Sequence, residues 1–482
     1  MALTKATNSM ITGAQINIKD FESLSSGGTD WQPAIQAAID SLDTGSDYTT
    51  GGVIYFPVGR YYIKSPIIVR TTGEYEKLAS ITLQGEGMHN TIIDCADGFV
   101  GEQAVYAQDS TYCVFKDFQI MCWFRANTGL EIKRGNEITV ERVFCQKAVT
   151  SDFRIWECFM LTMNQCRAKG GATGFNFSDG FNTSLNIVNC YAVASESTPS
   201  IGQGFLIRDV SYSTFTACGA DFTGRYGYRI SNTAGVTFLN CGNEQSKRSA
   251  FFFEASAALD ALYLINGTRC VLDGCFSVGA DADNGYGSIY SDNNASAPST
   301  IGIDVEVNRF IEINVDGVYS VASGGVAKSK ISLSGCKFAG AIISEVAVIN
   351  PIDVTRVNNL PVTSANTSVV DLASIFGNST SYSGILNVVA TFGKINANSA
   401  TAQINTAAYV LLVTKYPTGA GTNALSVVEI AKNGMTSGGN TSHPSFTWTG
   451  DEANNELEAT PVGSTSGNFY FYIGQLGSLS AS

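Results

Sequence analysis

The chain has 482 residues and a formal net charge of −13, with 44% hydrophobic and 15% charged residues. This much apolar material can fill a continuous core, which excludes a disordered chain. No basic patch stands out, which excludes a broad nucleic-acid surface, because phosphate binding needs clustered Lys and Arg. No signal-peptide pattern or membrane-length apolar run is present, so we expect folding in a cytoplasm without membrane insertion. With no CxxC pair and only two His, no metal and no other cofactor is expected.

The N-terminal sequence predicts a short attachment segment followed by a helix. Residues 1–20 are polar and are expected to form a lead-in or attachment segment. Asp30 is a plausible N-cap, and Pro33 follows in the first turn, where proline is tolerated. The helix would present one apolar stripe, formed by Trp31, Ala34, Ile35, Ala38, Ile39 and Leu42. Residues 51–63 then predict a strand, a turn and a second strand.

From about residue 80 to 340 the chain repeats short strands separated by Gly, Asn and Asp. Cysteines recur at intervals of 21 to 29 residues, at Cys122, Cys145, Cys166, Cys190, Cys218, Cys241 and Cys270. Similar segments open the strands that follow, beginning at Gly129, Gly174, Gly204, Gly227 and Ala250. A repeat of this length made only of short strands predicts a parallel solenoid, in which equivalent residues stack about 4.8 Å apart. In a reducing compartment the cysteines would be small buried side chains of its interior.

The pattern changes after residue 340. Residues 341–366 contain Pro351 and Pro361 and predict a linker or transition. Residues 367–482 show longer alternating strands, typical of an antiparallel β-sandwich. The fold class expected is therefore all-β. It comprises a parallel β-helix over residues 21–340, with an N-terminal capping helix and a C-terminal sandwich domain.

The N-terminal segments also carry a family resemblance. The helix from Asp30 to Asp40, the strands of residues 51–63, and the segments 83–87 and 91–94 together resemble the start of pectate-lyase-like right-handed β-helix proteins found as phage tailspike depolymerases. The resemblance covers roughly residues 1–340 and implies a right-handed coil and a homotrimer.

The same resemblance implies a function. It implies a virion tail protein that folds in the host cytoplasm, contacts other tail proteins through its N-terminus, and acts at the bacterial cell surface. There it would bind and depolymerise a capsular or O-antigen polysaccharide. The C-terminal domain would serve trimerisation or carbohydrate binding.

Two neighbouring coils align a pair of carboxylates. With these coils superimposed on their cysteines, Asp221 coincides with Glu244, and Arg225 coincides with Arg248. Hydrolysis of a glycosidic bond uses two carboxyl groups that flank it, one as acid and one as base or nucleophile. Asp221 and Glu244 are therefore the predicted catalytic residues, with the arginine pair and Lys247 offsetting their charge and holding the sugar. The alternative is a solvated turn whose charged side chains simply face water.

Three further residues are candidates for substrate contact. Tyr226, expected in the loop beside Arg225, could stack on a sugar ring or act as a base. Asp179 and Asp209 share a second register, which a turn-forming ladder also explains.

Several functions remain open at this point. The leading hypothesis is an endo-acting hydrolase that uses the carboxylate pair. A polysaccharide lyase with Tyr226 or Lys247 as base is the second, and an unsaturated product would identify it. A receptor-binding adhesin without activity is the third, and a secreted pectinase is disfavoured by the missing signal peptide. In a trimer, a groove between subunits would change how the carboxylates pair.

Overall fold

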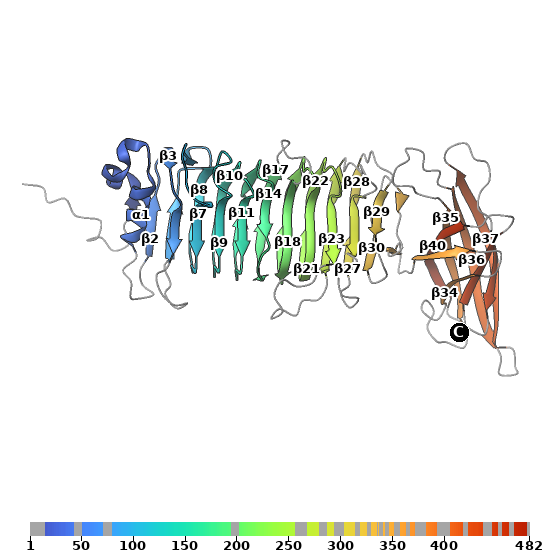
Figure 1. Cartoon of the computed structure of the whole chain (residues 1–482). Coiled ribbons are helices and arrows are strands. Elements are labelled where there is room, and N and C mark those ends of the chain that lie inside the picture. Colours follow the sequence, from blue (N-terminus) through green and yellow to red (C-terminus); the bar gives the residue numbers. More distant parts are fainter. Residues whose placement is uncertain are drawn as a thin grey trace, which may run out of the picture.

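The computed structural model describes residues 15–42, 51–70, 80–193, 202–255, 268–278, 287–293 and 303–313, and shorter stretches from 319 to 479. Figure 1 shows most of these residues as a long row of strands that lie side by side. All pairings in this row are parallel, and backbone hydrogen bonds join its strands into one 32-stranded sheet that winds through successive coils. No helix in the described part of the chain is long and apolar enough to cross a lipid bilayer.

The strands of the solenoid stack on three faces, which the chain visits in the same order in each coil. Face A consists of β4 (Ile67–Arg70), β7 (Gln103–Gln108), β9 (Thr128–Lys133), β11 (Ser151–Trp156), β14 (Thr173–Phe177), β18 (Gln203–Ser211), the start of β21 (Tyr226–Leu239), β23 (Phe251–Ala255), β26 (Ile289–Asn293), β29 (Tyr319–Gly324) and β31 (Ala341–Ile342). Strand β15 (Asn182–Thr183) joins the end of β18.

The second face follows face A in each coil. Face B consists of β1 (Ile16–Asn17), β2 (Gly51–Tyr55), β5 (Ser80–Gln84), β8 (Val114–Met121), β10 (Thr139–Gln146), β12 (Thr162–Asn164), β16 (Asn186–Val188), β19 (Thr214–Thr216), the end of β21, β24 (Thr268–Asp273), β27 (Ile303–Asn308), β30 (Ser329–Ser334) and β32 (Ala347–Asn350).

The third face carries mostly strands of three to five residues. Face C consists of β3 (Gly59–Ile63), β6 (Thr91–Cys95), the second halves of β8 and β10, β13 (Arg167–Lys169), β17 (Tyr191–Val193), β20 (Gly219–Asp221), β22 (Gly242–Glu244), β25 (Phe276–Val278) and β28 (Ile311–Ile313). The predicted parallel β-helix is therefore confirmed.

A helix closes the N-terminal end of the solenoid, as Figure 1 shows for α1 (Gln32–Asp40). The Gln36 side chain of this helix satisfies backbone groups at the edge of β4. Gln36 Nε2 donates to the Ile68 carbonyl, and Ile68 N–H donates to Gln36 Oε1, both at 3.0 Å. Two 3₁₀ segments, Ile18–Leu24 and Ser26–Gly28, precede it. Asp30 is not the N-cap as predicted, because Trp31 occupies that position; Asp30 Oδ1 instead accepts from Gln32 N–H and Lys64 N–H.

Aromatic rings stack through the interior along the solenoid axis. Phe153, Phe175, Phe205, Tyr228 and Phe251 hold the same position in five successive face A strands, and each is fully buried. Their ring centroids are 4.6–4.8 Å apart and their planes nearly parallel. This spacing equals that of the strands, so each coil adds one ring to the stack.

The cysteines belong to more than one interior column. The prediction that Cys122 to Cys270 form a single stack is therefore wrong. One column consists of Cys166, Cys190, Cys218, Cys241 and Cys275. The residues two positions before these cysteines pair with one another in register on face B, so the cysteines lie at equivalent positions of successive coils. Cys145 pairs instead with Ala168, and Cys270 with Val236. All twelve cysteines are free and eleven are buried, which confirms them as small interior side chains.

The coils turn at left-handed residues that also lie in columns. Where the chain leaves face A, the turning residues have φ between 49° and 71°. They are Asp109, Arg134, Glu157, Asp179, Asp209 and Asn232, of which Asp209 and Asn232 lie within β18 and β21. Asp and Asn adopt this conformation most readily among residues with a side chain, because their short polar groups bond to nearby backbone. The corners therefore recur at equivalent positions and keep successive coils in register.

Beyond the solenoid the strands become antiparallel. Five form one sheet, β33 (Val357–Val362), β35 (Tyr382–Phe392), β36 (Asn405–Pro417), β37 (Asn423–Thr436) and β40 (Gly467–Leu479). Three form another, β34 (Thr367–Asp371), β38 (Phe446–Asp451) and β39 (Glu456–Pro461). Two antiparallel sheets are the arrangement that the predicted sandwich requires. The parallel sheet itself continues past residue 340 to Asn350, into the segment predicted as a linker.

We expect the aromatic stack to carry much of the stability. Replacing Phe205 by Ala would open a cavity between two stacked rings and lower the free energy of unfolding by about 3–5 kcal/mol. Urea or thermal unfolding measures this loss. The matched control is Phe222→Ala, at a corner where the ring is 45% exposed and the loss should be much smaller. Equal losses in the two variants would contradict the stack as a source of stability.

One interior carboxylate should make stability depend on pH. Asp152 is fully buried and accepts from the N–H groups of Ala148 and Gly171, both at 3.1 Å. Burial raises its pKa to about 7, although the backbone donors oppose the shift. The protonated form is thus favoured in the folded state. The stability that Asp152 contributes is fully present below the pKa that Asp152 has in the unfolded chain. It is lost as the pH rises through about 7, the pKa in the folded state.

An Asp152→Asn variant, which mimics the protonated acid, should lose this part of the pH dependence. Its melting temperature relative to the wild type should therefore rise between pH 4 and pH 7, whatever the offset at low pH. Thermal unfolding over this range measures the difference. A difference that stays constant with pH would contradict the assignment.

Candidate active site

The structure places Asp221 and Glu244 side by side on face C. Strands β20 and β22 pair in parallel with Asp221 opposite Glu244. The residues before them, Ala220 and Asn243, are fully buried, so the two carboxylates occupy the outward positions of their strands. The alignment on cysteines thus gave the register that the backbone adopts.

The two carboxylates differ in environment. Asp221 is 9% exposed, whereas the Glu244 side chain is exposed. Burial raises the pKa of Asp221, and the charge of Glu244 raises it further. The phenol of Tyr191, which donates to Asp221 Oδ2, and a backbone hydrogen bond from Glu244 act in the opposite direction. Neighbouring carboxyl groups with different environments can divide the roles of acid and base.

Tyr191 comes from the preceding coil, where β17 pairs with β20. Burial and the hydrogen bond to Asp221 raise the pKa of Tyr191 to about 12, so the phenol keeps its proton at neutral pH. Its ring lies over Gly219, where a Cβ would come within 2.9 Å of Tyr191 Cδ2. Glycine at this position therefore allows the ring to reach across to Asp221.

A second aromatic ring lies on the other side of the carboxylates. Phe276 of β25 is in register with Gly242, and a Cβ on that glycine would come within 2.2 Å of the ring. Tyr191 and Phe276 thus lie over the two glycines that stand two positions before Asp221 and Glu244. Flat aromatic surfaces beside a carboxylate pair suit the apolar faces of sugar rings.

The predicted arginines lie elsewhere than expected. Arg225 and Arg248 are brought together at Tyr226, across a corner from the carboxylates, with guanidinium carbons 5.7 Å and 5.9 Å from its ring centroid. Tyr226 begins β21 rather than lying in a loop; it is 4% exposed and stacks on Phe252 at 4.2 Å. The groups that shift the pKa of Asp221 do not include these arginines.

The remaining predicted residues are dispersed. The side chain of Lys247 is exposed at the corner after β22. Asp179 and Asp209 are left-handed residues at the corners where the chain leaves face A, which fits the turn ladder. Asp179 pairs with Arg154 at 3.0 Å, and Asp209 accepts from Asn232. These residues are therefore not gathered around the carboxylate pair.

Tyr191 is the residue that sequence reasoning missed. It directly follows Cys190, and Gly219 and Gly242 directly follow Cys218 and Cys241. The same cysteine alignment would have placed it on the outward row next to the carboxylates. The signal was therefore present, but the contact depends on a ring that lies across the neighbouring coil.

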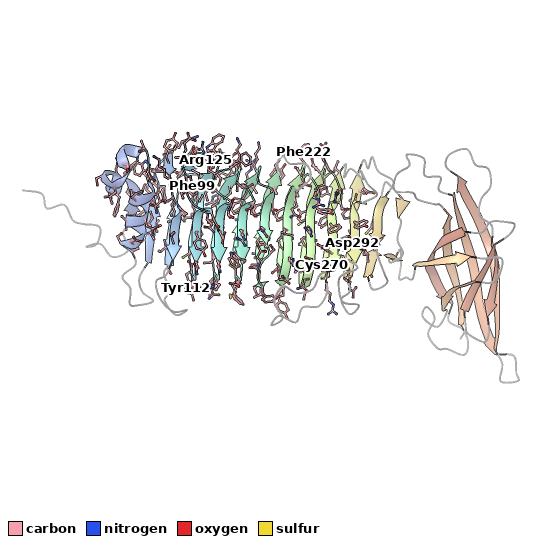
Figure 2. The ribbon with its side chains drawn as sticks, in the orientation of Figure 1. Phe99, Tyr112, Arg125, Phe222, Cys270 and Asp292 are labelled. Atoms are coloured by element: carbon pink, nitrogen blue, oxygen red, sulfur yellow. The ribbon has the colours of Figure 1, made fainter. Side chains whose placement is uncertain are left out.

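The connections that follow the face C strands differ in length. The corners that follow β20 and β22 are short, spanning residues 222–225 and 245–250, and Figure 2 labels Phe222 at the edge of the solenoid. The connections after β17 and β25, on the coils to either side, are the longer segments 194–202 and 279–288. In the described part of the chain, no cluster of three or more His, Cys, Asp or Glu residues could hold a metal ion.

Comparison with known proteins agrees with the parallel β-helix architecture. Residues 15–247, slightly less than half of the chain, match the family model described as rhamnogalacturonase A/epimerase, pectate lyase-like. Together with the strand pairing, this match confirms the predicted right-handed parallel β-helix fold.

Two solved structures share the architecture over 96% of this chain. They are full-length tailspike protein 2 from the Escherichia coli O157:H7 bacteriophage CAB120 (TM-score 0.54, 10% identity, 71% of that chain covered) and the enzymatically active domain of bacteriophage CBA120 tailspike protein 2 (TM-score 0.53, 9% identity, 79% covered). At this identity the likeness shows the fold alone.

One sequence relative is more similar over a short stretch. The chain is 36% identical over 91 residues to mannuronan C5-epimerase AlgE1 of Azotobacter vinelandii. This stretch is 19% of the chain and only 6% of that protein.

The site makes opposite predictions for two substitutions. Glu244→Gln removes a like charge and should lower the pKa of Asp221, whereas Tyr191→Phe removes a donor to the carboxylate and should raise it. Titration of ¹³C-labelled Asp carboxyl groups by NMR measures both shifts, with Asp221→Asn to assign the signal. Shifts of the same sign would contradict the described geometry.

Proposed function

We propose that this chain is a phage tailspike enzyme that binds and depolymerises a bacterial surface polysaccharide by endo-hydrolysis. The observation that carries the proposal is the registered pair of Asp221 and Glu244 with Tyr191 donating to Asp221. The fold shared with two tailspike proteins supports the placement in a virion tail. Homotrimer formation and contact of the N-terminus with other tail proteins are part of the proposal.

In this mechanism Asp221 is the general acid. Its burial favours the protonated form, and Tyr191 occupies Oδ2, which leaves Oδ1 to carry the proton. Asp221 donates that proton to the glycosidic oxygen as the bond to the anomeric carbon breaks. Glu244, whose side chain is exposed, acts at the anomeric carbon either as a nucleophile or as the base that takes a proton from the attacking water.

A lyase on the same scaffold is the second candidate. The feature that favours it is the Tyr191 phenol beside the carboxylates, since a tyrosine can donate a proton to a leaving group. Tyr226, which the sequence suggested as a base, is buried against Phe252, and its hydroxyl accepts from Arg248 at 3.3 Å. Elimination would leave an unsaturated sugar that absorbs ultraviolet light, whereas hydrolysis would not.

Release of reducing ends from a panel of capsular and O-antigen polysaccharides tests the proposal. Asp221→Asn and Glu244→Gln should each lower turnover by about 10²- to 10⁴-fold, because each removes an acid or base from the reaction. The matched controls are Asp304→Asn and Glu306→Gln on β27, two exposed acids of face B that should leave turnover unchanged.

Unchanged melting temperatures would show that all four variants are folded. Activity retained in Asp221→Asn and Glu244→Gln would remove the site but keep the enzyme. Binding of a polysaccharide without any product would favour an adhesin.

A further inference from the structure

Two exposed cations lie on face C, two coils before Asp221. Arg167 and Lys169 are the outward residues of β13, and Lys169 is connected through Val193 to Asp221 by consecutive register pairs. Two strand spacings separate them, roughly 10 Å. A polysaccharide that lies along the coils over the carboxylates would therefore also pass over these cations.

Neither cation has an acidic partner among the residues that the structure describes. Their registered neighbours are Phe144 and Tyr191 for Arg167, and Gln146 and Val193 for Lys169, none of which is acidic. Most arginines on the described coils behave differently, since Arg60, Arg125, Arg134, Arg142, Arg154, Arg229 and Arg309 are all paired with carboxylates. In a chain of net charge −13, such positive charge is available to an external anion.

Arg167 is also held in position and lies within electrostatic reach of the site. Its guanidinium carbon lies 5.2 Å from the centroid of the Phe144 ring, a cation–π contact that orients it on the outer face. Its charge lowers the pKa of Tyr191, against the larger effect of burial. The cations and the carboxylates are thus parts of one continuous surface.

We propose that the substrate is an acidic polysaccharide, and that Arg167 and Lys169 bind an anionic group, such as a carboxylate, on a sugar near the bond that is cleaved. This inference rests on the proposed function and specifies its substrate class. The anionic sugar lies on the β13 side of the site, where the two cations provide charge-assisted hydrogen bonds. On the opposite side Phe276 and Val278 offer an apolar surface and suit a neutral sugar.

The test uses a uronate-containing bacterial polysaccharide and the same polymer after reduction of its carboxylates to alcohols. Arg167→Gln/Lys169→Gln should raise KM for the acidic polymer roughly tenfold or more, with little change in kcat, because charge-assisted contacts are lost away from the reacting atoms. The KM of the wild type for the acidic polymer should rise with salt, and this rise should be smaller for the variant. On the reduced polymer the variant and the wild type should have equal KM.

The matched control is Arg269→Gln/Lys64→Gln, which removes the same two charges from exposed positions on other strands or connections and should leave KM unchanged. Arg167→Lys with Lys169 intact should recover most of the affinity. A variant with wild-type KM on the acidic polymer, or cleavage restricted to neutral polymers, would overturn the inference and leave the proposed function in place.

If the wild type cleaves no polymer, the proposed function fails, and binding then decides the inference separately. Isothermal calorimetry with the acidic polymer should show weaker binding by Arg167→Gln/Lys169→Gln than by the control variant. Equal binding by the two would overturn it.

Discussion

The parallel register between successive coils is the constraint on which the rest of this molecule depends. Each strand bonds to its equivalent one coil away, so every position in the repeat meets the same position about 4.8 Å along the axis. The interior stack of Phe153 to Phe251 satisfies this spacing with rings 4.6–4.8 Å apart. Left-handed corner residues such as Asp179 and Asp209 turn the chain at matching positions. Packing and corner geometry thus both keep the ladder in register.

At the candidate site the same register brings two like charges together, which is unfavourable, whereas in the interior it brings together rings that attract. Identical charges in register repel, so carboxylates at equivalent positions of adjacent coils are costly unless their surroundings differ. Here the difference is that Asp221 is buried and bonded to Tyr191, while Glu244 stays exposed. The glycines at 219 and 242 leave the space that the aromatic rings need. Two carboxylates in register would repel each other in identical surroundings. Because their surroundings differ, one can favour the protonated form while the other stays exposed, as acid–base chemistry requires.

The repeat made much of this predictable from sequence. Strand periodicity and coil length indicated the solenoid, and aligned cysteines indicated the register of Asp221 with Glu244. Prediction failed where a side chain leaves its own coil or position. The Tyr191 side chain reaches Asp221 on the neighbouring coil. The Arg225 guanidinium lies near the Tyr226 ring, across a corner from the carboxylates. Cys270 was assigned to the wrong interior column, because spacing along the chain does not reveal where extra residues are inserted.

Those inserted residues have a consequence for how the molecule can change over generations. The coils that hold the carboxylates close with the short corners 222–225 and 245–250, whereas the longer connections 194–202 and 279–288 belong to the coils on either side. Substitutions and length changes in the longer segments leave the backbone ladder between β20 and β22 untouched. The paired strands that hold the two carboxylates can therefore be retained while the lengths of the neighbouring connections change over generations.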